Sequence, residues 1–188
     1  MSHIRLDLGC GNKPKDGFLG VDLRDYGRSD ILVADLRGTW KWDDDSVDEV
    51  FSAQFVEHLT ARERVHFANE LYRVLKPGAT AEIIVPHWAS GRAYGDLTHQ
   101  WPPVSEFWFL YLSREWRLSQ APHADAAHCV CVSRNECLCY SCDFQIESGP
   151  ELHSDIVSRN YEFQQFAATY YREACQNLVS TWTKPEAS

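Results

Sequence analysis

The most constraining feature of this sequence is the segment LDLGCGN at residues 6–12, where an apolar alternation runs straight into a Gly-x-Gly turn. A short apolar run that ends at glycine is typical of a buried strand in a parallel sheet, and we expect that strand at residues 4–8. Gly9 and Gly11 have no Cβ, so the backbone can turn sharply there and approach a ligand closely. A second apolar segment, GVDL, contains Asp22, whose carboxylate is placed to bind both hydroxyls of a ribose. The pattern predicts an α/β fold that binds a nucleotide.

Two further residues indicate which nucleotide fits. A dinucleotide fingerprint needs a third glycine where this chain has Pro14. Asp7 lies two residues before the first glycine, where its charge disfavours a pyrophosphate and favours a ligand with an ammonium and a sulfonium. S-adenosylmethionine (SAM) carries both groups, and we favour it over a dinucleotide. The alternative is a tight turn without a ligand.

Composition limits the classes of partner. The chain has 188 residues, which suits a single domain over residues 1–188, and its net charge of −9 argues against bulk nucleic-acid or anionic-membrane binding. No apolar run is long enough to span a bilayer, and no signal-peptide pattern is present. Seven cysteines without secretory context favour reduced thiols and a cytoplasmic location. The oligomeric state is left open.

Later segments supply more of a nucleotide site. We expect strands at residues 30–34, 47–53 and 79–85, and a helix from Thr60, with Glu63 as its capping-box partner, to about residue 75. Ligands of open α/β sheets bind at the carboxyl edge, so residues 52–58 should line the pocket. Asp35 is placed to bind the exocyclic amine of an adenine, or it is a surface turn or cap. The alternative for His58 is a structural histidine packed at the start of a helix.

The motifs LDLGCG, GVDL, VADL, SVDEVFSAQFVEHL and RVLKPGATAEIIVP, in this order and spacing, resemble class I SAM-dependent methyltransferases of the small type 11 group. The resemblance covers residues 4–86. It implies a doubly wound, Rossmann-like α/β sheet of seven strands with an antiparallel last strand. The link between the first two strands is too short for the usual first crossover helix, so we expect the methionine end of the site to be more open. The implied SAM contacts are Asp7, Gly9, Cys10, Gly11, Asp22, Leu23, Asp35, Leu36, Ser52, Ala53 and Gln54.

Residues 87–118 are rich in aromatic side chains and should form a lid over the methyl-donor pocket. Most of these rings are best explained as core filler. The segment DLTH offers Asp96 and His99, a carboxylate and an imidazole in a turn, which a deprotonating site needs. His99 or Asp96 is therefore our candidate general base, with His87 and Tyr94 as orienting groups. A shared structural turn explains the segment equally well.

Cysteines gather in residues 121–133 and 136–146, which we expect to form the antiparallel hairpin that ends the sheet. Residues two apart share a face of a strand, so a zinc or other thiophilic site is conceivable there. Plain core thiols are the preferred interpretation, with a metal site and a disulfide as the alternatives, and we expect no metal. The cysteines concerned are Cys129, Cys131, Cys137, Cys139 and Cys142.

Apolar residues at helical spacing predict one long helix over residues 155–183. The whole sequence favours a SAM-dependent methyltransferase with a small-molecule acceptor. Two alternatives remain: a SAM- or nucleoside-binding regulatory protein without catalysis, and a metal-binding protein built on the cysteine hairpin.

Overall fold

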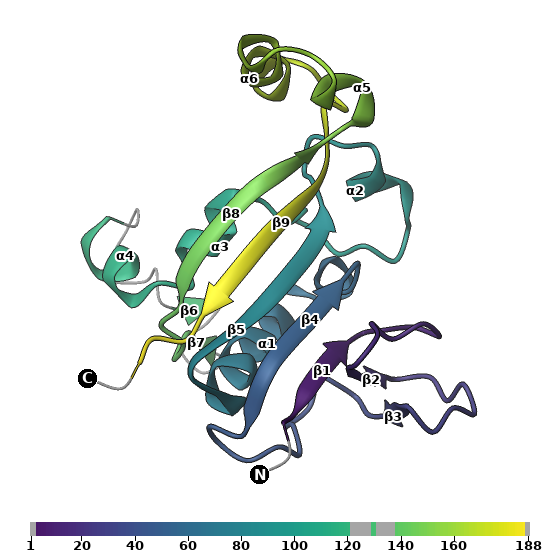
Figure 1. Ribbon diagram of the computed structural model, residues 1–188. Helices are drawn as coiled ribbons and strands as arrows, with labels where there is room; N and C mark the ends of the chain where they lie inside the picture. The colour runs from purple at the N-terminus through teal and green to yellow at the C-terminus, as the bar shows by residue number, and fades with distance from the viewer. Residues whose placement is uncertain (1–2, 121–128, 131–137, 187–188) are drawn as a thin grey trace.

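The computed structural model describes residues 3–120, 129–130 and 138–186. Seven strands form one sheet in the order β3-β2-β1-β4-β5-β9-β8 (Figure 1). The first five pair in parallel, and β9 runs antiparallel to both of its neighbours, as predicted. The strands are β1 (Arg5–Leu8), β2 (Leu19–Asp22), β3 (Ile31–Val33), β4 (Val47–Ala53), β5 (Leu75–Pro86), β8 (Gln145–Leu152) and β9 (Cys175–Thr183).

One face of the sheet carries the main core. The helix α1 (Ala61–Val74) packs there, and its predicted capping box is present: the Thr60 backbone N–H donates to Glu63 Oε2 (2.8 Å), and the Glu63 N–H donates back to Thr60 Oγ1. Trp182 of β9 is fully buried in the same core. The other helices are η1 (Val56–His58), α2 (Arg92–Gly95), α3 (Glu106–Leu110), α4 (Arg114–Ser119), α5 (Ser154–Val157) and α6 (Tyr161–Tyr170). No helix in the described part of the chain is long and apolar enough to cross a membrane.

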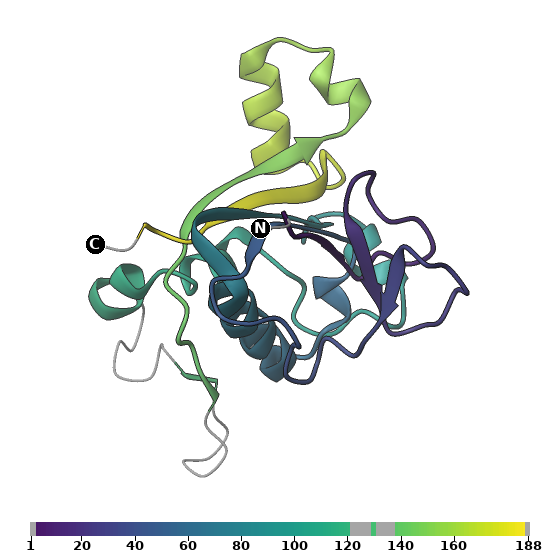
Figure 2. The ribbon, with the colours of Figure 1, turned by 60° about the horizontal axis from the view of Figure 1, so that its bottom comes forward.

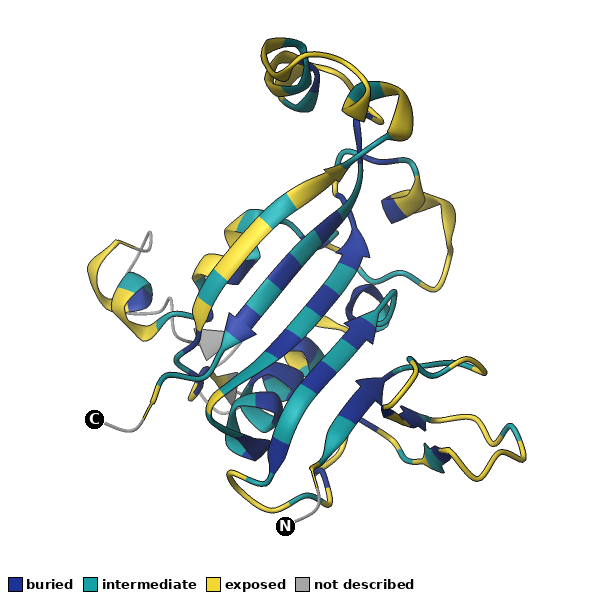
Figure 3. Ribbon diagram, in the orientation of Figure 1, coloured by how far each residue is buried: buried dark blue, intermediate teal, exposed yellow. Residues whose placement is uncertain are grey.

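The opposite face, which is turned toward the viewer in Figures 1 and 3, has no helix over it among the described elements. The links at residues 9–18, 23–30 and 34–46 contain none. The first link instead lies across the sheet: Lys15 Nζ is 3.3 Å from Glu82 Oε2 and 3.9 Å from the centroid of the Phe51 ring. Phe18 from the same link is buried under Arg5. The absence of a first crossover helix therefore agrees with the sequence analysis.

The long C-terminal helix predicted over residues 155–183 is wrong. The segment forms α5, α6 and the strand β9, and Figure 2 shows α5 and α6 projecting from the end of the sheet. Ala174, Leu178 and Trp182 are four residues apart, as in a helix, but Leu178, Ser180 and Trp182 also alternate into the core of a strand. Antiparallel pairing with β5 and β8 favours the strand over the helix.

The prediction that the cysteine hairpin ends the sheet is also wrong. The strands β6 (Cys129–Val130) and β7 (Leu138–Cys139) pair antiparallel, but they form a separate two-stranded sheet. The final pair of the large sheet is β8 and β9, about residues 145–183. The rest of the hairpin, residues 121–128 and 131–137, lies outside the described residues.

Candidate functional site

A pocket of about 200 Å³ lies at the carboxyl edge of β1 and β2, where ligands of open α/β sheets bind. Its walls combine apolar side chains with two carboxylates and one imidazole. Five of the predicted SAM contacts line it: Gly9, Asp22, Leu23, Asp35 and Leu36. Of residues 52–58, which were also expected here, Phe55 and His58 do so. The remaining lining residues are Ala34, Arg37 and Leu59.

Gly9 is packed directly against an aromatic ring. Its φ of +72° lies in the left-handed region. A Cβ built on it would meet Phe55 Cγ at 2.3 Å, so the ring of Phe55 fills the space that any larger residue needs. Gly11 also has a positive φ, +58°, but a Cβ there would meet nothing within 4 Å. The two glycines of the turn therefore serve different needs: close packing at Gly9, and open space above Gly11.

Asp22 is held in a fixed orientation at the end of β2. Its Oδ2 accepts from the backbone N–H of Gly11 (2.9 Å) and its Oδ1 from the N–H of Arg24 (2.9 Å). Each carboxylate oxygen has a second acceptor site, so two hydroxyl donors can still be bound. Beside it Leu23 is 60% exposed and gives the pocket an apolar wall.

Asp35 is paired with a cation at the mouth of the pocket. Arg37 Nε and Nη2 donate to its two oxygens, both at 2.8 Å, and hold the pKa of this carboxyl below its ordinary value. Both side chains are about half exposed, which makes the pair accessible to an exchange of partners. An adenine amine therefore has to share Asp35 with Arg37 or replace it.

The other residues predicted to contact SAM do not line this pocket, and several have partners within the fold. Asp7 is buried and accepts from the Lys15 N–H (2.8 Å); burial raises the pKa of its carboxyl. The Ser52 hydroxyl is buried and donates to the Leu8 carbonyl (2.8 Å), which ties β4 to β1. The Cys10 thiol donates to the Gly11 carbonyl at 3.3 Å.

Ala53 and Gln54 lie where β4 ends. Gln54 has a φ of +56°, and a non-glycine residue held in the left-handed region is a frequent mark of a functional site. Its side-chain amide donates to Asn177 Oδ1 at 3.2 Å, toward β9 rather than toward the pocket.

A cluster of titratable residues lies beside the pocket. The rings of His58 and His99 are 4.8 Å apart, edge to face. The Asp96–His99 turn is tied to η1 because the Gln100 N–H donates to the Glu57 carbonyl (2.8 Å) and His58 Nδ1 contacts Thr98 Oγ1 (2.9 Å). The structure thus brings both candidate bases, His99 and Asp96, next to His58, which lines the pocket.

The hydrogen bonds assign one nitrogen of each imidazole. The Thr98 hydroxyl donates to Asp96 Oδ1 (2.7 Å), so it accepts from His58 Nδ1–H. His99 Nδ1 lies 3.2 Å from the Ala93 carbonyl, which is an acceptor only, so this nitrogen also carries the proton. In the neutral form of each ring, Nε2 is therefore the nitrogen without a proton. Burial and the neighbouring His99 lower the pKa of His58, which keeps that ring neutral.

Glu57 was not named individually in the sequence analysis. It lies within residues 52–58, which were expected to line the pocket, and directly precedes His58. It is 4% exposed, and neither carboxylate oxygen has a hydrogen-bond partner among the described residues. Burial raises the pKa of this carboxyl to about 7. Arg64 is buried nearby, but its guanidinium donates to the carbonyls of residues 56, 57, 100 and 102 instead.

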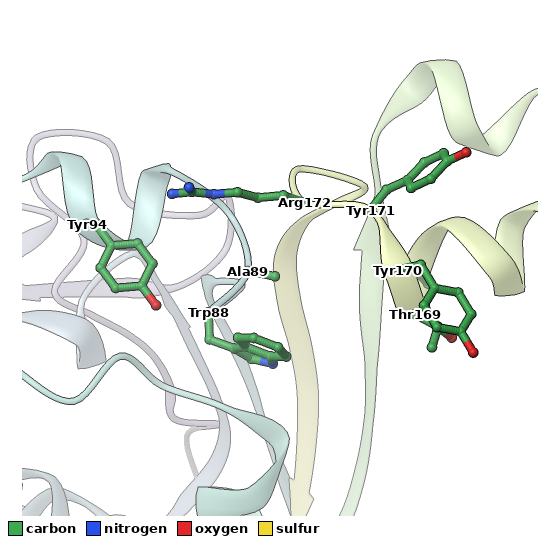
Figure 4. A pocket seen from close by; sticks show the side chains of 8 residues that line it. Trp88, Ala89, Tyr94, Thr169, Tyr170, Tyr171 and Arg172 are labelled. Atoms are coloured by element: carbon green, nitrogen blue, oxygen red, sulfur yellow. The ribbon is translucent and has the colours of Figure 1, made fainter.

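A second, larger pocket of about 470 Å³ opens between the lid and the α6–β9 link (Figure 4). Trp88 and Tyr94 line one side and Tyr170 and Tyr171 the other, while the side chain of Arg172 extends from the α6–β9 link toward Tyr94. Trp88 and Tyr94 also line an adjoining pocket of about 500 Å³ beside α3. The helix α2 joins this region to the first pocket, because it carries both Tyr94 and the Ala93 carbonyl that contacts His99.

His87, which we expected to orient an acceptor, is buried and fully engaged. Its Nε2 lies 3.0 Å from Glu106 Oε1, and its Nδ1 accepts from the Ala89 N–H. This pairing lowers the pKa of the Glu106 carboxyl. His87 therefore ties the start of the lid to α3 within the same segment, whereas Tyr94 lines the second pocket.

The cysteines of the hairpin are described only in part. Cys142 is a free, fully buried thiol, and burial raises its pKa to about 12. Cys139 is disulfide-bonded, so the interpretation as a plain thiol is wrong there. The side chains of Cys129, Cys131 and Cys137 lie outside the described residues.

Comparisons with known proteins agree with the motifs and the topology. Residues 13–83 match the family described as a methyltransferase domain. A SAM-dependent methyltransferase from Archaeoglobus fulgidus is 16% identical, with 97% of this chain and 86% of that chain covered and a TM-score of 0.61. No curated protein matches the sequence.

Two further solved structures share the fold. A geranyl diphosphate C-methyltransferase from Streptomyces coelicolor A3(2) is 14% identical, with 97% and 71% of the two chains covered and a TM-score of 0.54. The [4+2]-cyclase SpnF is 17% identical, with 99% and 76% covered and a TM-score of 0.52. At these identities the likeness is one of fold.

Proposed function

We propose that this chain, which has the class I methyltransferase fold and matches the methyltransferase domain over residues 13–83, transfers a methyl group from SAM to a small-molecule acceptor. The family match and the sheet topology confirm the resemblance that the sequence motifs indicate. The observation that carries the proposal is the pocket over Gly9, with Asp22 at the end of β2 and Asp35 after β3.

The residues present suit SAM. Asp22 has the free acceptor sites for two ribose hydroxyls, Leu23 and Leu36 offer apolar faces to an adenine, and the open space above Gly11 admits the amino-acid end. The cofactor supplies an activated methyl group on a sulfonium. We place the adenosyl part in the first pocket. Asp7, which is bonded to the backbone of the link at residues 9–18 through the Lys15 N–H, would attract the cationic end by its negative charge.

Methyl transfer is an in-line displacement, so the protein mainly aligns the reacting atoms and excludes water. The acceptor atom forms a bond to the methyl carbon as the carbon–sulfur bond breaks, and S-adenosylhomocysteine leaves. An acceptor that is protonated at neutral pH also needs a base. We assign that role to His99, whose Nδ1 is held by the Ala93 carbonyl and whose Nε2 lies 4.0 Å from Asp96 Oδ2. Asp96 is better suited to stabilise the resulting imidazolium, because its bonds to Thr98 lower its own pKa.

We propose that the acceptor binds in the second pocket, the one between the lid and the α6–β9 link, which we call the aromatic pocket. Trp88 and Tyr94, each about half exposed, line it together with Arg172. Aromatic faces bind planar or apolar groups, and a guanidinium binds an anionic substituent. We therefore propose a small planar or apolar acceptor.

A second candidate function is SAM or nucleoside binding without methyl transfer. The observation that favours it is the missing first crossover helix, together with the solved [4+2]-cyclase that shares this fold at a TM-score of 0.52. A fold alone does not fix the chemistry performed on it.

Two experiments test these proposals. Purified protein is incubated with SAM and a fractionated small-molecule extract, and S-adenosylhomocysteine is quantified; its formation dependent on one fraction supports transfer, and its absence with every fraction supports the binding alternative. Calorimetric titration with SAM is repeated on Asp22→Ala, for which we expect at least a tenfold weaker affinity. Equal affinity in both proteins overturns the ribose assignment.

The base is tested once an acceptor is in hand. We expect His99→Ala to slow methyl transfer about 10²-fold or more. Asp96→Asn should slow it less, because it leaves the imidazole in place. An unchanged rate in His99→Ala removes the assignment.

A further inference from the structure

We propose that Glu57, His58 and His99 form a binding site for a divalent transition-metal ion at the wall of the cofactor pocket. One carboxylate oxygen and one nitrogen from each ring lie within 4.8 Å of one another. Two imidazoles and one carboxylate are a common protein ligand set for zinc, and also for iron. The inference does not depend on methyl transfer.

The orientation of both imidazoles suits metal binding. A ligating histidine usually donates its other N–H to an oxygen, which fixes the ring and leaves one lone pair for the ion. His58 has this arrangement through Nδ1 and the Thr98 hydroxyl, and His99 through Nδ1 and the Ala93 carbonyl. Thr98 is held in turn by Asp96. In the neutral form of both rings this leaves the Nε2 lone pair free for an ion.

The carboxylate of Glu57 is the second, independent observation. A buried carboxylate without hydrogen bonds is costly, and native structures rarely keep one without a reason. The nearby guanidinium of Arg64 offers an obvious partner, yet its hydrogen bonds go to four backbone carbonyls. Both oxygens of Glu57 thus remain unpaired within the described chain, next to two imidazoles. A cation on these oxygens would satisfy them.

The geometry needs only a small adjustment. Zinc lies about 2.1 Å from nitrogen and oxygen ligands, which places two tetrahedral ligand atoms about 3.4 Å apart. Starting from separations of at most 4.8 Å, the ligand atoms approach by at most about 1.4 Å. Three protein ligands leave one coordination position open, and His58 faces the cofactor pocket. A metal on His99 Nε2 uses the lone pair that a base needs, so metal binding and proton transfer to His99 exclude each other.

The test uses chelator-treated full-length protein without SAM, titrated with Zn²⁺ by calorimetry and with Co²⁺ by absorption. We expect one equivalent to bind with a micromolar or tighter Kd, and Co²⁺ to show visible bands of low coordination number without thiolate charge-transfer bands. Glu57→Gln and His99→Ala should each weaken binding at least tenfold. The control is His153→Ala, near α5, which should bind as the parent does.

Glu57→Gln keeps the shape of a side chain that makes no hydrogen bond, so its thermal midpoint without metal should not fall. Weaker metal binding at an unchanged thermal midpoint therefore identifies the loss of a ligand rather than a loss of stability. Three results overturn the site: no binding by the parent at 1 mM metal, equal binding by Glu57→Gln, or cobalt bands of thiolate ligation, which would place the metal on the cysteines.

Discussion

The two glycines of the first turn have the same backbone conformation and different surroundings, which yields a prediction for a matched pair of substitutions. A left-handed conformation costs a non-glycine residue roughly 1–2 kcal/mol, so Gly9→Ala and Gly11→Ala both lose about that much. Only Gly9→Ala also meets the ring of Phe55, and overpacking adds about 1–3 kcal/mol. Urea unfolding should show the larger loss for Gly9→Ala. Equal shifts of the two midpoints would contradict this account of the turn.

Cys10 lies between the two glycines of the turn, and we expect its thiol to be unreactive. Burial, followed by the charges of Asp7 and Asp22, raises its pKa to about 11. At pH 8 about one such thiol in a thousand is ionised, against roughly a quarter for an ordinary cysteine with a pKa near 8.5. We expect alkylation of Cys10 by iodoacetamide, followed by peptide mass spectrometry, to be roughly 100-fold slower in the native than in the unfolded protein.

The pH dependence of Cys10 labelling provides the control for this prediction. Because the thiolate forms only as pH rises toward 11, the native labelling rate should increase about tenfold per pH unit from 8 to 10 without levelling. Asp22→Asn removes one of the negative charges, so it should lower the pKa and speed labelling at pH 8. A rate that levels off near pH 9 would show an unperturbed thiol.

At the scale of elements, the N-terminal half of the fold follows from local sequence signals and the C-terminal part does not. The five parallel strands and α1 were predictable because each is marked within itself, α1 by Thr60, Glu63 and the KPG that follows it. The end of α6 has no such mark: Glu173 turns the chain with a φ of +65° where a glycine or proline would have shown the break. The strand β9 then depends on pairing with β5, a contact distant in sequence.

The site shows the same division. Gly9, Asp22 and Asp35 were identifiable because each lies at the carboxyl end of a strand or within two residues of it. The proximity of Glu57 and His99 was not identifiable from the sequence, because it requires the Asp96–His99 turn to fold back onto η1. Only the hydrogen bonds of Thr98 and Gln100 to η1 show that contact. The sequence signal for this cluster was the adjacent carboxylate and imidazole of Glu57 and His58, shortly after β4.

Glu173 also connects two elements that form the aromatic pocket. Its carboxylate accepts from the Gly91 N–H (2.6 Å) and from the Ser90 hydroxyl (3.0 Å), which holds the start of α2 against the α6–β9 link. Charge-assisted hydrogen bonds contribute about 1.5–3 kcal/mol. We expect Glu173→Ala to speed hydrogen exchange of the amides at residues 89–95 roughly tenfold or more, measured by mass spectrometry. Glu162→Ala, an exposed glutamate on α6, is the control, and equal protection in both variants would exclude the contact as a lid anchor.

At the scale of the whole molecule, one face of the sheet has no helix between β1 and β2, and this should determine how the cofactor binds. The pocket that the fold does form contacts the adenosyl side, through Gly9, Asp22 and Asp35, while only the short link carrying Lys15 lies beyond it. We therefore expect S-adenosylhomocysteine to bind at most about tenfold more tightly than adenosine, a difference of about 1.4 kcal/mol or less. Calorimetric titration with both ligands measures the ratio, and Asp22→Ala should weaken both in parallel since they share the ribose. A preference of a hundredfold or more for S-adenosylhomocysteine would mean that the link at residues 9–18 closes over the amino-acid end and replaces the missing helix in function.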